Sequence, residues 1–294
     1  MKQVSLKDFT VEFLPDTAKR EDISDELYFS NYAKYVSASK LHKISPFRNG
    51  SKDQYYDTTP QEWKPCFDFG TWIHALILER EDFCLAPNIN KPSSKLGAVL
   101  DEILRLRRKG KSIEDAINKA CKKVSYYTKS PATARKKIFT KANLEYYLKA
   151  SQYSNSYIIP SSADYDMIQG CVQSVLGNRV IYKQLVPTDV FGDPLEAHCE
   201  DTIFGDFKVT YKDQEYIIHG RGKIDHWSID PENKRLCLND VKTSFDPLVD
   251  DWMTAGHGYR LEYHLQFMYY LTMLKAYCEK HFGFDDTWTT KTHV

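Results

Sequence analysis

The sequence predicts an α/β protein in which a mostly helical first half is followed by a small sheet and a covering helix. Apolar residues recur at helical spacing up to about residue 176, and strand-like segments separated by turn-forming residues follow Pro194. The stretch from Leu261 to Tyr277 then returns to a helical pattern that is apolar nearly all round, so we expect it to pack across the sheet as a buried helix. We expect one domain, residues 1–294, because no repeat, low-complexity tract or linker interrupts the chain.

The composition is that of a folded globular protein. The 294 residues include 40 Lys plus Arg, 40 Asp plus Glu and 42% hydrophobic residues. No run of about 18 apolar residues appears, and the N-terminal segment lacks the apolar core of a secretory signal. We therefore expect a soluble, cytoplasmic protein with no membrane partner.

The cysteines argue against a disulfide framework, a zinc ribbon and an iron–sulfur cluster. They are odd in number, scattered, and never spaced C-x-x-C. The seven positions are 66, 84, 121, 171, 199, 237 and 278. Free thiols are the expected state.

The first helices are predicted from their caps and their apolar spacing. Ser37 can cap a short helix that runs through Ile44 and stops before Pro46. A second helix is expected over about 68–80, on the spacing of Phe69, Trp72, Ile73, Leu76 and Ile77.

Three polar helices are expected near 93–109, 112–127 and 132–150, and they form a helical basic insertion at about 92–150. The segment Arg105–Lys141 holds 13 basic and two acidic residues, a net charge of +11, although the whole chain is neutral. Such a block is either a solvated helical face or a track for DNA phosphates. Arg135, Lys136 and Lys137 are adjacent within it and are our candidate DNA-binding residues.

One more helix precedes the sheet, and a three-stranded meander follows it. Ser161 begins a capping-box-like start to the helix. The strands are expected over Leu195–Val209, Tyr216–Ile229 and Arg235–Thr243.

Two carboxylates and a lysine are expected to meet where the last of these strands ends. Alternation sends Asp240 and Lys242 to one face, and a five-residue turn between antiparallel strands brings Asp225 beside Asp240. Carboxylates of this kind bind hard cations such as Mg²⁺, and a neighbouring lysine can neutralise charge that develops on phosphorus. The alternative is a partly buried Asp–Lys ion pair.

Two helical pairs add to this pattern. Gly70 precedes His74 by one turn, so the glycine leaves room beside the imidazole. Gln266 and Tyr270 are one turn apart on the apolar C-terminal helix, where a glutamine needs a polar partner. Taken alone, each pair is better explained by ordinary packing.

In this order, the motifs G-x-x-x-H, G-x-G-x-x-D, D-x-K and Q-x-x-x-Y resemble those of the PD-(D/E)XK nuclease superfamily. The chain looks most like the RecB-like branch, and within it the exonuclease VIII (RecE-type) domain. The resemblance runs from about residue 35 to 280 and rests on the stretches YVSASKLHKISPF, FGTWIHALILE, DYDMIQGCVQSVLGN, GRGKIDHW, LNDVKTS and YHLQFMYYL.

The resemblance implies a restriction-endonuclease-like core, a small mixed sheet flanked by helices, at about 35–91 and 155–282. Asp225 and Asp240 would be metal ligands, helped by the Val241 carbonyl, and Lys242 would be the catalytic lysine. The remaining implied roles are His74 at the metal site, Gln266 and Tyr270 at the site or on the DNA backbone, and one further acidic ligand, either Glu196 or Glu200. The implied cofactor is Mg²⁺, for which Mn²⁺ can substitute, with no iron–sulfur cluster.

The implied activity is hydrolysis of double-stranded DNA from its ends, 5′ to 3′, in phage or bacterial recombination. Its product strand would pass to a single-strand annealing protein, and the enzyme would be a homo-oligomer around the DNA in the cytoplasm of a bacterial or phage-infected cell. Two alternatives stay open: a single-strand or structure-specific nuclease of the same fold, and a DNA-binding module that has lost catalysis.

Overall fold

The computed structural model divides into two compact units, Met1–Thr59 with Lys183–Val294, and Pro60–Tyr182. The residues that it describes are 9–46, 49–57, 59, 65–80, 83–86, 89–92, 94–126, 131–153, 157–243 and 262–293. Among the described helices, none combines the length and the apolar character needed to cross a bilayer.

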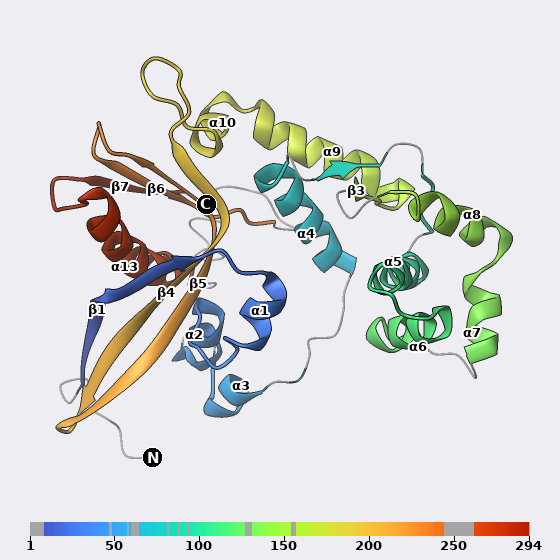
Figure 1. The fold of residues 1–294 in the computed structure, drawn as a ribbon, viewed down its shortest axis with the longest axis horizontal. Coiled ribbons are helices and arrows are strands. Elements are labelled where there is room, and N and C mark those ends of the chain that lie inside the picture. The colour runs from blue at the N-terminus through green and yellow to red at the C-terminus, as the bar shows by residue number, and fades with distance from the viewer. Residues whose placement is uncertain are drawn as a thin grey trace. The chain divides into compact units, whose positions relative to one another are not determined.

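The first unit is built on a mixed five-stranded sheet (Figure 1). The pairs from β1 to β6 are antiparallel, and β6 and β7 are parallel. The strands lie in the order β1 (Phe9–Glu21), β4 (Glu196–Tyr211), β5 (Gln214–Asp230), β6 (Arg235–Asn239) and β7 (Thr289–His293). The α/β class and the β4–β5–β6 meander are therefore confirmed.

The helices described for this unit accompany the sheet, and α13 packs directly on it. The Ser37 side chain caps α2 by accepting a hydrogen bond from the Lys40 N–H, as the sequence predicts. The helices are α1 (Asp25–Ser30), α2 (Ala38–Ile44), α3 (Lys52–Tyr56) and α13 (Tyr263–Phe282), and a further one, α10 (Arg179–Leu185), spans the boundary of the unit.

Helix α13 packs on the sheet and completes the core of the first unit. Met273, Leu274 and Cys278 are fully buried in a cluster with Trp227 and Leu238. The helix is not buried on all sides as its apolar composition predicts: Leu265 is 44% exposed and Met268 63% exposed. Burial follows the stripe that faces the sheet, because a helix on a single sheet buries only one face.

Two glycines of β5 explain how closely α13 approaches the sheet. A Cβ at Gly220 would lie 2.7 Å from the Tyr269 hydroxyl, and a Cβ at Gly222 would lie 2.8 Å from the Tyr270 ring. The G-x-G spacing therefore places two side-chain-free positions under two consecutive tyrosines of the helix.

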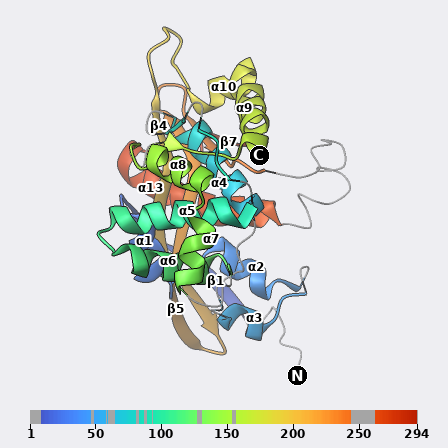
Figure 2. The ribbon, with the colours of Figure 1, turned by 90° about the vertical axis from the view of Figure 1, so that its right-hand side faces the viewer.

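The second unit is helical. Its α5 and α6 run side by side in both views (Figures 1 and 2), and its core gathers Leu100, Ile103, Ile117 and Ile138, all at most 2% exposed. Its elements are α4 (Pro65–Leu78), β2 (Cys84–Leu85), α5 (Ser94–Arg108), α6 (Ile113–Lys123), α7 (Pro131–Ile138), α8 (Lys141–Ala150), β3 (Tyr157–Ile158) and α9 (Ser162–Gly177). The helical region expected at about 92–150 lies within this unit.

A buried polar cluster supports this helical core. Lys91 is 7% exposed, forms an ion pair with Asp101, and lies over the Trp72 ring with its Nζ 4.5 Å from the centroid. The Tyr146 hydroxyl donates to Asp101 at 2.5 Å. Because each buried charge has a partner, the cluster avoids the cost of an isolated ion.

The elements differ from those predicted in several places, of which these bear on the fold. The single helix expected at 132–150 is two, α7 and α8, because Thr140 takes the extended conformation of an N-cap residue. β1 and β7 were not predicted, since both are edge strands whose side chains are largely exposed and give no apolar alternation. β6 ends at Asn239 rather than at Thr243.

Candidate functional site

Three carboxylates of the first unit lie in one row: one is on β4, one is on β5 and one directly follows the end of β6. The β4–β5 register pairs Cys199 with His226 and Asp201 with Ile224, so Glu200 lies opposite Asp225. The β5–β6 register pairs His226 with Asn239, so the next position along the chain, Asp240, lies on the other side of Asp225. The antiparallel turn thus brings Asp225 and Asp240 together, as the sequence predicts.

The backbone is irregular at this row. Glu200 has φ of 49° within β4, a conformation that non-glycine residues seldom adopt. On β5, Gly220 and Gly222 face α13, but beyond Asp225 it is Trp227 and Ile229 that lie in the core with α13. The residues of β5 that face α13 are therefore even-numbered before Asp225 and odd-numbered after it. A simple alternation of residues does not continue through the site.

Asp225 holds the chain that follows β6. Its Oδ2 accepts a hydrogen bond from the Val241 N–H at 2.7 Å. This N–H would otherwise continue the hydrogen bonding of the sheet, which explains why β6 ends at Asn239. The same bond fixes the Asp240–Val241 peptide beside Asp225.

Two lysines lie among the carboxylates. The Lys242 Nζ is 2.5 Å from Asp240 and 3.9 Å from Asp225, and the Lys223 Nζ is 2.9 Å from Glu200 and 2.6 Å from Asp25. Burial alone would lower the pKa of the Lys242 ammonium, but Asp240 and Asp225 outweigh it and the pKa is raised. Lys242 is therefore charged at neutral pH.

Helix α13 contributes Gln266 and Tyr270 to the same region. The Gln266 amide donates to Asp240 Oδ1 at 2.9 Å, which supplies the polar partner that a glutamine on this helix needs. Tyr270 packs on Gly222. Burial, and then the charges of Tyr28, Asp240 and Asp225, raise the pKa of its hydroxyl, so Tyr270 stays neutral beside the carboxylates.

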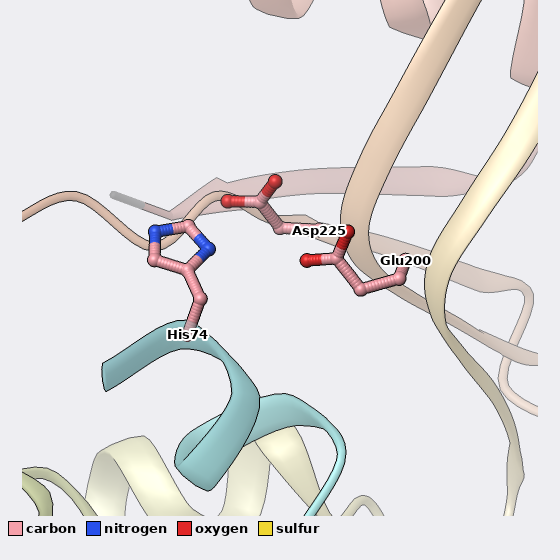
Figure 3. A group of neighbouring side chains, drawn as sticks. All are labelled: His74, Glu200 and Asp225. Carbon is pink, nitrogen blue, oxygen red and sulfur yellow. The ribbon is translucent and has the colours of Figure 1, made fainter. Parts of the chain in front are cut away.

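The two glutamates that the sequence leaves as alternatives have different environments. Glu200 is opposite Asp225, and one carboxylate oxygen of each lies within 4.8 Å of the other (Figure 3). Glu196 is exposed and lies opposite Ile229, with its carboxylate 2.8 Å from the His198 Nε2. Of the two, the structure brings Glu200 to the row of carboxylates.

The remaining candidate residues belong to the second unit. His74, also drawn in Figure 3, is half-buried on α4, and its role at the metal site stays a prediction. Arg135, Lys136 and Lys137 are exposed on α7, where Arg135 forms an exposed ion pair with Glu114 at 3.1 Å.

The carboxylate row has the donors of a site for a hard divalent cation. Glu200, Asp225, Asp240 and Asp25 carry four negative charges against the two positive charges of Lys223 and Lys242. All these donors are oxygens, and carboxylate oxygens of Glu200 and Asp225 lie within 4.8 Å of each other, near enough to contact one cation. A bound Mg²⁺ would balance the net charge of −2.

An apolar cavity of about 390 Å³ adjoins the row. It lies between α2 and α13. Gln266 lines this cavity and also donates a hydrogen bond to Asp240. Glu262, 1% exposed, also lines it and accepts a hydrogen bond from the Ser45 hydroxyl.

Comparison with known proteins identifies no relative of this chain: no family model, no curated protein and no solved structure matches it.

Proposed function

We propose that this chain is a Mg²⁺-dependent deoxyribonuclease with a restriction-endonuclease-like core, which hydrolyses phosphodiester bonds of double-stranded DNA from its ends. The observation that carries the proposal is the row formed by Glu200 on β4, Asp225 on β5 and Asp240 just after β6, with Lys242 paired to it. In an ordinary ion pair, one carboxylate balances one lysine. Here the carboxylates outnumber the lysines, so a net negative charge remains for a cation to balance.

Each residue of the row has a role in this proposal. Glu200 and Asp225 would hold the cation together with Asp240, and the Val241 carbonyl would add a further ligand. When bound, the cation would lower the pKa of a water molecule and polarise the phosphoryl oxygens. Lys242 would neutralise the charge that grows on the phosphate oxygens, and Gln266 would keep Asp240 in position.

The test is cleavage of end-labelled linear duplex and closed circular duplex, with Mg²⁺ and with EDTA. We expect Mg²⁺-dependent release of label from linear DNA only. Asp225→Asn, Asp240→Asn and Lys242→Met should each lower the rate on the order of 100- to 1000-fold, because each removes a preorganised charge.

Matched controls exist on the same strands. Asp206→Asn and Lys208→Gln alter an acid and a lysine of β4 whose side chains, among the described residues, pair with His219 and with Glu12 and Glu215, and they should leave the rate unchanged. Wild-type activity in any of the three site variants would refute the site. Nicking of closed circles would favour a structure-specific nuclease, and DNA binding without cleavage would favour an inactive module.

A further inference from the structure

A second cavity of the first unit, of about 300 Å³, lies on the part of the sheet formed by β5, β6 and β7. Helix α10 and the segment from residue 187 to 195 supply its other walls. Its lining is mostly polar and includes three cations, Lys183, Arg235 and Lys291, and two carboxylates, Asp189 and Asp230.

The strand register sets the positions of the cavity floor. Ser228, Cys237 and Lys291 lie opposite one another on β5, β6 and β7, and Asp230 lies opposite Arg235 in the next row. On β6, Cys237 is three residues from Asp240, which corresponds to about 10 Å along an extended chain. The cavity is therefore separate from the carboxylate row.

The charges that line this cavity are unbalanced. Asp230 accepts the Asn233 N–H at 3.1 Å and the Asn233 Nδ2–H at 2.8 Å. Asp189 accepts the N–H groups of Phe191 and Asp193, each at 2.8 Å. Both carboxylates are therefore used by turns of the backbone.

The three cations have no such partners. Within the described parts of the chain, the side chains of Lys183, Arg235 and Lys291 form no ion pair and no hydrogen bond. Cys237 lies between two of them: burial raises the pKa of its thiol, and Arg235 and Lys291 act against that rise. With Asp189 and Asp230 still charged, the lining carries a formal net charge of +1, and its cations have unused hydrogen-bond donors.

We propose that this cavity binds a phosphate dianion, either as inorganic phosphate or as the terminal group of a mononucleotide. Two ammonium groups and a planar guanidinium suit the several oxygens of a phosphate, and the hydroxyls of Thr188 and Ser228 add donors. A volume of about 300 Å³ lies at the lower end of the range of small-molecule pockets, and Pro187 and Leu195 provide an apolar wall for a sugar or base. The proposal does not depend on nuclease activity.

The experiment is calorimetric titration of the full chain in EDTA, so that no divalent cation occupies the carboxylate row. The probes are inorganic phosphate, deoxyadenosine 5′-monophosphate and unphosphorylated deoxyadenosine. We expect saturable binding of phosphate, of the monophosphate, or of both, and none of deoxyadenosine. Tighter binding of the monophosphate identifies a nucleotide as the ligand, and equal binding identifies the phosphate alone.

Variants separate this cavity from the carboxylate row. Arg235→Gln and Lys291→Gln should each weaken binding by about 10- to 100-fold, because each removes a charge-assisted hydrogen bond. Asp225→Asn should leave the affinity unchanged. Lys234→Gln is the matched control, since Lys234 is next to Arg235 but bonds to the Thr287 hydroxyl at 2.7 Å.

Four results would overturn the proposal. The first two are that neither phosphate probe binds saturably, and that deoxyadenosine binds as tightly as the monophosphate. The other two are that Lys234→Gln weakens binding as much as Arg235→Gln does, and that Asp225→Asn abolishes binding. Circular dichroism of each variant checks that its fold is retained, and the exposed positions of Arg235 and Lys291 make folding defects unexpected.

Discussion

Glu200 and Glu196 stand four residues apart on one strand, and their contrast provides a test at the scale of single residues. We predict that Glu200→Gln weakens Mg²⁺ binding at least about 10-fold, since it removes a charged oxygen opposite Asp225. Glu196→Gln should have no such effect because Glu196 is exposed and contacts His198. Titration of cleavage rate against Mg²⁺ compares the two, and equal effects would contradict the assignment of Glu200.

The position of Glu200 also shows the limit of sequence reasoning at this scale. The turn length was enough to bring Asp225 to Asp240, because antiparallel pairing is fixed by counting residues. The turn length does not distinguish Glu196 from Glu200 as the further ligand. That distinction depends on the positive φ of Glu200, at which the alternation of side chains between the two faces of the sheet is interrupted. No residue type in the sequence signals that conformation, since glutamate rarely adopts it.

At the scale of elements, the sequence predicts the helices and strands that have a strong internal pattern of apolar residues, but it does not predict the edge strands of the sheet. Ser161 caps α9 through the Asp164 N–H, and α5, α6 and the β4–β5–β6 meander lie where apolar spacing and turns place them. β1 pairs with β4 at residues 9–14 and again at 19–21, and its register shifts between Leu14 and Lys19, around Pro15. Its stability comes from pairing with another strand, which no local pattern records.

Helix α5 carries a carboxylate that ties the basic helices together. Glu102 is 8% exposed and binds Arg105 at 2.5 Å and Lys123 at 2.9 Å. Burial would raise the pKa of Glu102, but the hydrogen bonds of Arg105 and Lys123 outweigh it and the pKa is lowered. The resulting stability is present above the ordinary glutamate pKa of about 4.3 and is lost as the pH falls through the lowered value.

We predict that Glu102→Gln lowers the free energy of unfolding by about 1 kcal/mol at pH 7, and that the difference shrinks below about pH 4. Urea unfolding at a series of pH values measures it. The exposed Glu145, which pairs with Lys149 one turn away, is the control, and Glu145→Gln should have a much smaller effect. A loss that does not vary with pH would show that the ion pairs of Glu102 are not its cause.

The basic residues of α7 yield a prediction about DNA. Neutralising Arg135, Lys136 and Lys137 together should weaken DNA binding and reduce the slope of log affinity against log salt by about 2 to 3, since each phosphate contact contributes about 0.9. Neutralising Lys19, Lys212 and Lys234 removes the same charge elsewhere and should change the slope less. An unchanged slope in the α7 variant would leave these residues as a solvated helical face.

At the scale of the whole molecule, the chain is neutral while 13 of its 40 basic residues lie in Arg105–Lys141. A neutral subunit attracts DNA weakly at physiological salt, where charges are screened beyond about 8 Å. We predict a ring-like or encircling homo-oligomer that needs a DNA end, because several basic segments around one passage raise the local potential and trap the substrate.

Light scattering of the free protein and digestion of linear duplex after addition of excess competitor DNA examine this assembly. We expect a multiple of the 34.2 kDa chain mass and continued digestion of the DNA already engaged. A monomeric protein that stops digesting the labelled DNA as soon as competitor is added would contradict the predicted assembly.

The β4–β5 hairpin has a consequence for the order of folding. Its strands are joined by Lys212 and Asp213, both with positive φ, which is the two-residue turn that matches the twist of the paired strands. Its contacts near the turn are local in sequence, so the hairpin can form early, and it zips from the turn toward Glu200 and Asp225. These two carboxylates would then meet before β6 brings Asp240 and Lys242. Half of the cation site would exist in a chain that still lacks its lysine, and divalent cations should therefore accelerate folding as well as stabilise the product.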